Sequence, residues 1–210
     1  MTGDDVAANL VAVRDRIVHA GGDRDRVTVV AITKDLPVAA VHAAVAAGIV
    51  DVGENRAQEL AAKADAAPAG VRWHFIGRLQ RNKVRLVASV VHLWQSVDRL
   101  ELGRAIAGRA PGAAVLAEVN VADDPAKAGV PPDDAPALVD GLRSAGLAVG
   151  GLMTIPAAGR DPRPAFARLA ALADRLGLAE VSMGMSDDFE VAVEEGATIV
   201  RVGRAIFGPR

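Results

Sequence analysis

The sequence contains no cysteine and no tyrosine, and only 3% of its residues are aromatic. Without cysteine, the protein can form neither a disulfide framework nor a thiolate metal site. The four histidines are scattered along the chain, and no spacing among them would bring two metal ligands together. These absences exclude the commonest metal centres, and we expect no bound metal.

A strong charge imbalance is also missing, because 24 basic and 26 acidic side chains leave a formal net charge of -2. With no basic run and no aromatic-basic patch, nucleic acid is not expected as a partner. No stretch approaches the roughly 18 uninterrupted apolar residues of a membrane span, so no membrane partner is expected either. The N-terminal segment lacks the basic start and apolar core of a signal peptide. We expect a cytoplasmic protein whose residues 1–210 form a single domain.

Strand-like and helix-like segments alternate along most of the chain. Residues 1–22 predict a leading helix, because Val6, Leu10, Val13 and Ile17 recur at helical spacing. Eight later runs of apolar or β-branched residues predict strands at 27–33, 50–54, 71–77, 91–98, 114–121, 147–155, 179–185 and 198–203. Helix-like runs rich in alanine and leucine separate these strands, for example 37–48 and 166–177, which both end on glycine.

This alternation indicates a parallel sheet covered by helices, because continuous apolar strands are typical of sheets buried on both faces. Eight such units over residues 27–210 predict an α/β fold, a single (β/α)8 barrel of the TIM type with an extra N-terminal helix. An open doubly wound sheet is the alternative. The stretch 121–136, rich in proline and aspartate, is the one long loop that we expect.

The first predicted strand runs directly into a lysine, Lys34. In barrels of this type, functional residues collect at the carboxyl ends of the strands. A lysine at a strand end is most often only a solvated charge. An apolar setting nevertheless favours the neutral amine, which is the nucleophile that a Schiff base with a carbonyl requires. Lys34 is therefore a candidate for covalent attachment of a carbonyl ligand.

The turns after the last two predicted strands favour a different chemistry. Gly184 and Ser186 follow the seventh strand, and Gly203 and Arg204 follow the eighth. Backbone amides at helix starts, exposed by glycine and supplemented by a hydroxyl or guanidinium, bind phosphate, and barrels often place such a site there. The alternative is that Ser186 only caps a helix. A phosphate site combined with a Schiff-base lysine indicates pyridoxal phosphate or a sugar-phosphate aldol substrate.

Seven motifs narrow this choice. They are AITKDLP (31–37), DVGENRAQEL (51–60), WHFIGRLQRNK (73–83), SVDR (96–99), GLMTIP (151–156), SMGMSDDFEVAVEEGAT (182–198) and VRVGRAIFG (200–208). Together and in this order they resemble the pyridoxal-phosphate homeostasis protein family, from about residue 27 to the C-terminus. The resemblance implies a single barrel similar to the N-terminal domain of alanine racemases, with bound pyridoxal phosphate and no established catalytic turnover.

The same resemblance implies a cofactor-binding role for six residues and a catalytic role for none. Lys34 would hold pyridoxal phosphate as an aldimine, and Asn55 would lie near the cofactor ring. Ser186, Gly203 and Arg204 match the positions that hold the phosphate.

The sixth residue, Arg201, would face the pyridine nitrogen. An arginine there discourages protonation of the nitrogen, which weakens the ring as an electron sink and suits a carrier better than a general carbanion catalyst. Two residues depart from the family pattern. Arg204 replaces the usual threonine or serine, so that a longer cation stands in place of a hydroxyl. Asp35, directly after the lysine, is also unusual.

Three functions remain open at this point. The first is a non-enzymatic, monomeric carrier that binds pyridoxal phosphate and buffers it or delivers it to apoenzymes that depend on it. The second is an amino-acid racemase of the alanine-racemase type. Racemisation needs a second base, which those enzymes take from a tyrosine on a second domain, whereas this sequence has no tyrosine. The third is a class I aldolase, which would use the lysine without a cofactor. We expect the carrier.

Overall fold

The structure is a computed structural model that describes residues 3–122, 127–157 and 159–209. Within these residues, eight parallel strands form a closed barrel in chain order. They are β1 (Thr28–Ile32), β2 (Asp51–Glu54), β3 (Arg72–Phe75), β4 (Val91–Val97), β5 (Ala114–Glu118), β6 (Ala148–Met153), β7 (Glu180–Ser182) and β8 (Ile199–Val202). The barrel closes where β1 pairs with β8, with Thr28 opposite Ile199 and Ala31 opposite Val202. The predicted barrel is confirmed, and the open-sheet alternative is wrong.

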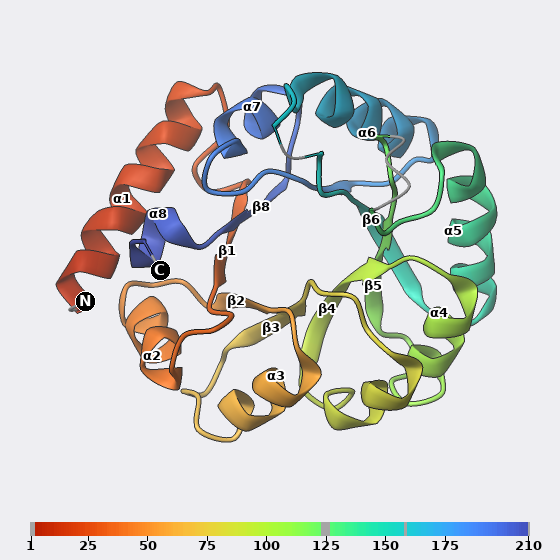
Figure 1. The fold of residues 1–210 in the computed structure, drawn as a ribbon, viewed down its shortest axis with the longest axis horizontal. Coiled ribbons are helices and arrows are strands. Elements are labelled where there is room, and N and C mark those ends of the chain that lie inside the picture. The colour runs from red at the N-terminus through yellow and green to blue at the C-terminus, as the bar shows by residue number, and fades with distance from the viewer. Residues whose placement is uncertain (1–2, 123–126, 158, 210) are drawn as a thin grey trace.

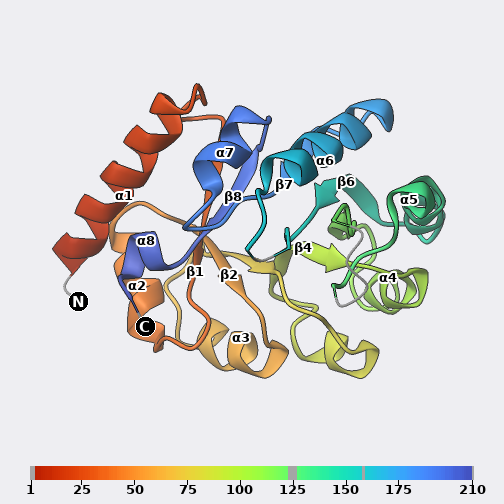
Figure 2. The ribbon, with the colours of Figure 1, turned by 45° about the horizontal axis from the view of Figure 1, so that its top comes forward.

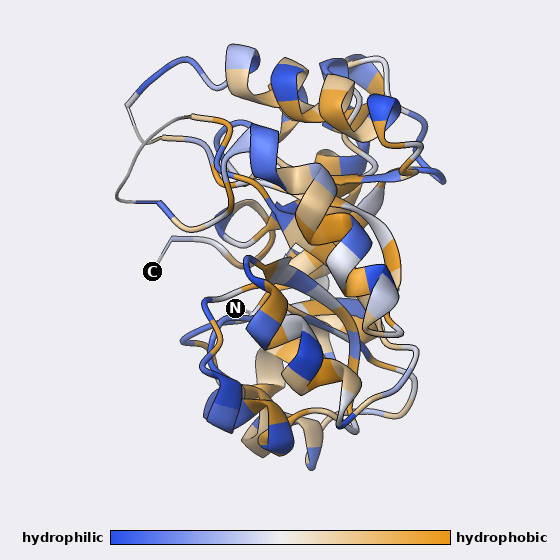
Figure 3. Cartoon of the chain, turned by 90° about the vertical axis from the view of Figure 1, so that its right-hand side faces the viewer, coloured by the Kyte–Doolittle hydropathy of each residue, from blue (hydrophilic) through white to orange (hydrophobic). Residues whose placement is uncertain are grey.

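Helices surround the ring of strands (Figure 1). They are α1 (Gly3–His19), α2 (Val38–Ala46), α3 (Ala57–Ala64), α4 (Leu100–Ala107), α5 (Ala135–Ser144), α6 (Arg163–Arg175), α7 (Phe189–Glu194) and α8 (Arg204–Phe207), with 3-10 helices η1 (Arg81–Leu86) and η2 (Pro132–Asp134). The link from β3 to β4 contains η1 instead of the expected α-helix, and 3-10 helices are typically used in such short pieces. The peripheral helices carry hydrophilic and hydrophobic residues side by side, as elements between a core and solvent do (Figure 3).

The leading helix α1 lies outside the barrel near the point of closure, alongside α8 (Figures 1 and 2). The four apolar residues at helical spacing are all buried, which confirms the predicted helix. Arg16 of this helix also forms a salt bridge with Glu190 of α7 at 2.7 Å. The segment before β1 therefore packs against the end of the chain. Among the described residues, no helix has the length and apolar character to cross a membrane.

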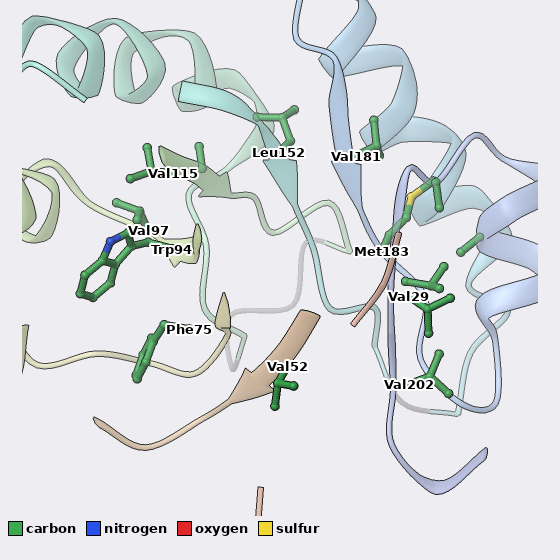
Figure 4. Packing of buried hydrophobic residues seen from close by; sticks show 14 of the residues in the cluster. Val29, Val52, Phe75, Trp94, Val97, Val115, Leu152, Val181, Met183 and Val202 are labelled. Atoms are coloured by element: carbon green, nitrogen blue, oxygen red, sulfur yellow. The ribbon is translucent and has the colours of Figure 1, made fainter. Parts of the chain in front are cut away.

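The strands have two buried faces, as their continuous apolar sequences predict. Along β1, Val29 and Ala31 belong to the large cluster between strands and helices, whereas Val30 and Ile32 belong to a smaller cluster with Leu116. Neighbouring residues of a strand point to opposite faces, so the smaller cluster lies in the barrel interior. Figure 4 shows members of the larger cluster, contributed by all eight strands.

Most strands are shorter than the apolar runs that predicted them. The run 114–121 forms a strand only to Glu118, and the run 179–185 only from Glu180 to Ser182. At the carboxyl end of the barrel the chain leaves the hydrogen-bonded ladder and turns toward the next helix. The last residues of each run are therefore free to line the mouth of the barrel.

Candidate functional site

The inward-facing rows of several strands end in polar residues at the mouth of the barrel. Val30 and Ile32 face the interior, and Lys34 is the next residue on the same side, two positions beyond Ile32. In the same way, Glu118 follows Leu116 on β5. Because side chains alternate along a strand, an apolar interior row leads directly to a functional group at its end. Lys34 itself lies in the turn after β1 and lines the cavity at the mouth.

A cavity of about 470 Å³ opens at this end of the barrel. Its volume falls in the usual range of small-molecule sites. The residues around it come from the ends of most strands: Ile32, Lys34, Asn55, Ile76, Gly77, Arg78, Glu118, Ala128, Ile155, Met185, Ser186, Asp187, Asp188, Arg201, Gly203 and Arg204. All six residues assigned to the cofactor from the sequence are among them. In the described ranges, no three histidine, aspartate or glutamate side chains gather as a metal site would require.

The loop that carries Lys34 is held in a left-handed turn. Asp35 has a φ of 60°, a conformation that few residues other than glycine adopt. Its backbone N–H donates to Glu59 Oε1 at 2.8 Å, and its carboxylate lies 3.4 Å from the guanidinium of Arg56. Both partners lie on or beside α3, so this helix fixes the direction in which the chain leaves Lys34.

A buried lysine, Lys63, binds the backbone of the same loop at Thr33, next to Lys34. Its Nζ donates to Thr33 O at 2.7 Å, to Glu54 Oε1 at 2.6 Å and to Glu59 Oε1 at 2.6 Å. Three acceptors use all the donors of an ammonium group. Lys63 is therefore a structural cation, whereas the half-buried Lys34 points into the cavity.

Ser186 binds two backbone amides on the far side of the cavity. Its Oγ accepts hydrogen bonds from Gly203 N at 3.2 Å and from Ala205 N at 3.3 Å. The serine thus caps α8, whereas Asp188 stands at the start of α7 and accepts a bond from Met185 N. The alternative in which Ser186 caps the helix directly after it does not hold in this structure.

At two glycines near the mouth, the backbone lies so close to neighbouring residues that a side chain would not fit. Gly184 has a φ of +87°, and a Cβ there would lie 2.6 Å from Ala192 Cβ. A Cβ on Gly77 would lie 2.2 Å from the backbone oxygen of Asn55. Larger residues would push the turn after β7 and the end of β3 out of position.

Arg204 reaches the rim of the cavity but already has a partner. Its guanidinium forms a salt bridge with Asp187, and their side chains are 58% and 74% exposed. An exposed pair of this kind contributes little to stability, so the arginine can exchange one anion for another at low cost.

Arg201 is the buried cation of the site. Its Nη1 donates to Ser182 Oγ at 2.6 Å, and its Nη2 donates to Thr154 O at 2.7 Å. Burial lowers the pKa of Arg201 to about 10, against the opposing effect of the nearby Glu118 and Asp188 carboxylates. The guanidinium therefore stays charged at neutral pH.

Glu118 was missed by the sequence assignment, because the predicted strand continues to residue 121 whereas β5 ends at Glu118. Its side chain is buried and has no hydrogen bond to its carboxylate among the described residues. Burial and the neighbouring Asp98 raise the pKa of Glu118 to about 7, and the cations Arg201 and Arg78 only partly oppose this. The strand-end rule that singled out Lys34 applies to this carboxyl only once the observed end of β5 is known.

His74, considered from the sequence as a ligand contact or a structural residue, lies deeper in the barrel. It is buried, does not belong to the cavity wall described above, and bonds to Asp51 and Gln95. These two partners satisfy both ring nitrogens, which fits the structural role.

A second cavity of about 960 Å³ adjoins the first and shares Asn55 and Arg78 with it. Two sequence motifs contribute to this second cavity through residues that do not line the first one. They are LQRNK, through Lys83, and SVDR, through Arg99. Arg56 and Arg78 also line this second cavity, so its wall is positively charged, and we refer to it as the basic groove.

Comparisons with known proteins identify the family of this chain. Residues 3–210 match the family described as alanine racemase, N-terminal domain. A pyridoxal phosphate homeostasis protein of Pseudomonas aeruginosa is 40% identical over 99% of this chain and 95% of its own. The solved structure of PipY from Synechococcus elongatus, with pyridoxal phosphate bound, has a TM-score of 0.85 and 33% identity, covering 97% of this chain and 100% of PipY.

A more distant likeness concerns the fold alone. The alanine racemase of Corynebacterium glutamicum has a TM-score of 0.71 at 19% identity, over 99% of this chain and 61% of the racemase. The close relatives, in contrast, match over nearly their whole length. The chain belongs to the pyridoxal phosphate homeostasis protein family, whose barrel is that of the alanine racemase N-terminal domain.

Proposed function

We propose that this protein binds pyridoxal phosphate covalently through Lys34 and buffers or delivers it in the cytoplasm. One observation carries the proposal: the six residues assigned from the sequence line a single cavity that also suits a phosphorylated aldehyde. The related PipY, whose structure has pyridoxal phosphate bound, supports the same assignment.

The phosphate end of the site is supplied by β8 and α8. The amides of Gly203 and Ala205 already converge on one oxygen, Ser186 Oγ, and a phosphate oxygen can accept the same two bonds. Arg204 stands beside them in its exposed salt bridge with Asp187. Turning from that carboxylate to a phosphate would replace one charge-assisted bond by another.

The ring end of the site is supplied by Arg201. A guanidinium has no acceptor atom, so toward a pyridine nitrogen it can only donate. The nitrogen then remains an acceptor and stays unprotonated. When bound, pyridoxal phosphate supplies an electron sink, and an arginine at this position weakens that sink.

Covalent attachment requires a free amine. The Nζ of Lys34 would replace the aldehyde oxygen of the ligand, and that oxygen would leave as water. Lys63 is a poor competitor, because Glu54, Glu59 and a backbone oxygen already hold its ammonium group. Asn55 lines the same cavity and would contact the ring between these two ends.

A racemase is the second candidate, and Glu118 is the observation that favours it. Two-base racemisation needs a proton acceptor on each side of the reacting carbon. Lys34 and Glu118 approach from opposite sides of the barrel, and a pKa of about 7 lets Glu118 hold or release a proton at neutral pH. Arg201 argues for the carrier, because it opposes the protonated ring that stabilises a carbanion.

Delivery implies a recipient, and we infer that the protein acts as a monomer on apoenzymes that use pyridoxal phosphate. The basic groove next to the cofactor cavity supports this, because its cations suit an acidic surface beside the recipient's active site.

The deciding experiment starts with an absorbance spectrum of purified protein incubated with pyridoxal phosphate. Borohydride then reduces the covalent link, and peptide mapping locates the labelled residue. A visible band and a label on Lys34 are expected. A label on Lys63 or Lys83, or no label, would overturn the proposal.

A further inference from the structure

A chain of buried polar side chains crosses the interior of the barrel below the cavity. Arg201 Nη1 donates to Ser182 Oγ at 2.6 Å, and Ser182 Oγ donates to Gln95 Oε1 at 2.7 Å. Gln95 Nε2 lies 2.7 Å from His74 Nδ1, and His74 Nε2 lies 2.9 Å from Asp51 Oδ1. All five side chains are buried. We refer to this sequence of contacts, from Arg201 to Asp51, as the interior chain.

The two ends of the interior chain determine its direction. Arg201 can only donate hydrogen bonds, and the Asp51 carboxylate can only accept them. Ser182 accepts from Arg201, so its own proton goes to Gln95 Oε1. Gln95 then presents its NH2 group to His74 Nδ1, and the single ring proton of His74 lies on Nε2, toward Asp51. In this arrangement each of the four contacts joins one donor to one acceptor.

The opposite orientation of Gln95 leaves a group unpaired. Its NH2 would then meet Ser182 Oγ, which already accepts from Arg201, and the serine proton would have no acceptor among the described residues. His74 would also need protons on both nitrogens, although the charge of Asp51 is already matched by Arg72, whose Nε donates to it at 2.8 Å. Buried polar groups without partners are costly, so the first orientation prevails.

We propose that Gln95 and His74 are positioning residues for Arg201. Arg201 is held from behind by two bonds, one to Ser182 at the head of the interior chain and one to Thr154 O. Two bonds at different nitrogens fix the plane of the guanidinium and leave its other N–H groups to face the cavity. The inference rests on the proposed function, in which these groups meet the ring nitrogen of the cofactor.

The consequence is that residues far from the cavity set the electronic state of the bound ligand. If Gln95 no longer accepts from Ser182, the hydroxyl is free to turn, and Arg201 loses one of its two fixed contacts. The guanidinium then meets the ring nitrogen less closely, and the nitrogen is protonated more easily.

The direction of the interior chain can be tested without any cofactor. Nitrogen-15 NMR of the histidine rings in the full-length protein at pH 8 distinguishes the two neutral forms, and His74→Asn identifies the signals of His74. We expect a proton on Nε2 and a bare Nδ1. A proton on Nδ1, alone or together with one on Nε2, would overturn the proposed direction.

The positioning role is tested with pyridoxal phosphate itself. Gln95→Met keeps the length of the side chain but removes both bonds, and Leu116→Met is the control, an interior substitution outside the interior chain. We expect Gln95→Met to weaken binding about tenfold, the effect of one lost hydrogen bond, and to shift the visible band of the bound cofactor at neutral pH. Leu116→Met should leave both unchanged.

The two readouts separate the possible failures. If wild-type protein binds the cofactor and Gln95→Met matches it in affinity and spectrum, the positioning role is wrong and the proposed function stands. If Gln95→Met does not fold, Ser182→Ala makes the same comparison by removing the bond to Arg201 directly, and a wild-type spectrum in that variant also overturns the role. If wild-type protein binds no cofactor, the proposed function is wrong, and the NMR result still decides the direction.

Discussion

Lys34 and Glu118 face one cavity from opposite sides of the barrel, Lys34 just beyond β1 and Glu118 at the end of β5. Neither the amine nor the carboxyl has a hydrogen bond among the described residues. Folded proteins usually pair the ionisable groups that they bury. Two unpaired groups of opposite charge at one mouth therefore indicate a space arranged for a ligand.

Replacing Lys34 should abolish covalent binding without damage to the fold. Lys34→Ala removes the only amine that points into the cavity from the described residues, and it breaks no internal bond. We expect loss of the visible absorbance band and an unchanged melting temperature of the cofactor-free protein. Lys83→Ala, which alters the neighbouring groove, is the control and should keep the band. Retention of the band in Lys34→Ala would refute the assignment.

Arg204→Ala should weaken binding of pyridoxal phosphate by about tenfold or more, because a charge-assisted bond contributes roughly 1.5–3 kcal/mol. Arg204→Thr should recover part of that loss by offering a hydroxyl to the phosphate. Fluorescence titration of both variants measures the effect, with Arg104→Ala on the exposed face of α4 as the control. Equal affinity in wild type and both variants would mean that the phosphate is held by backbone amides and Ser186 alone.

Glu118 should reduce the stability of the cofactor-free protein at neutral pH. Its pKa rises from 4.5 to about 7 on folding, so between these values the folded state binds more protons than the unfolded state. The free energy of unfolding then falls as the pH rises through this window. The fall is about 3 kcal/mol at most, since a shift of one pKa unit corresponds to about 1.4 kcal/mol. Glu118→Gln should remove this loss.

Urea denaturation at pH 4 and pH 8 measures the effect. Glu118→Gln should match the wild type at pH 4 and exceed its free energy of unfolding at pH 8. The control is Glu101→Gln, which changes an exposed carboxyl and should have little effect at either pH. Equal gains at both pH values would show that the carboxyl of Glu118 does not titrate as described.

The loaded protein should not racemise alanine or other common amino acids at enzymatic rates. The tyrosine that alanine racemases use as the second base is absent from this sequence, loss of a positioned base costs ~10²–10⁴-fold in rate, and Arg201 opposes carbanion formation besides. Chiral analysis of amino acids incubated with the loaded protein measures turnover, and activation of an apoenzyme measures transfer of the cofactor. Turnover of ~1–10³ s⁻¹ without transfer would favour the racemase, and Glu118→Gln would then be expected to abolish it.

The sequence predicted the barrel because its signals are local. Apolar strands, helical runs and terminal glycines each reflect a few neighbouring residues, and eight repeats of the pattern leave few other folds. The six residues assigned to the cofactor, which line one cavity, were singled out because they follow strands or because motifs of the family contain them. Glu118 was missed because the apolar run continues to residue 121, and the sequence does not reveal that the strand ends at Glu118.

The interior chain could not be predicted from the sequence, because its members are far apart along the polypeptide. Ser182 and Gln95 are 87 positions apart and meet only because the barrel brings β7 opposite β4. Each looks like an isolated polar residue in an apolar strand. Likewise, Lys63 binds two glutamates only because α3 packs against β1 and β2. The spacing of these residues along the chain does not predict that packing.

The pairing of β1 with β8 brings Lys34, in the turn after β1, to the same cavity as the turns after the last two strands, which hold the phosphate in the proposed function. Neither half of the chain holds both attachment points, and during synthesis the lysine emerges long before Gly203 does. A nascent or truncated chain would therefore retain the ligand poorly. In the proposed function, bound pyridoxal phosphate would link the first strand to the last two, and cofactor binding would report that the barrel has closed.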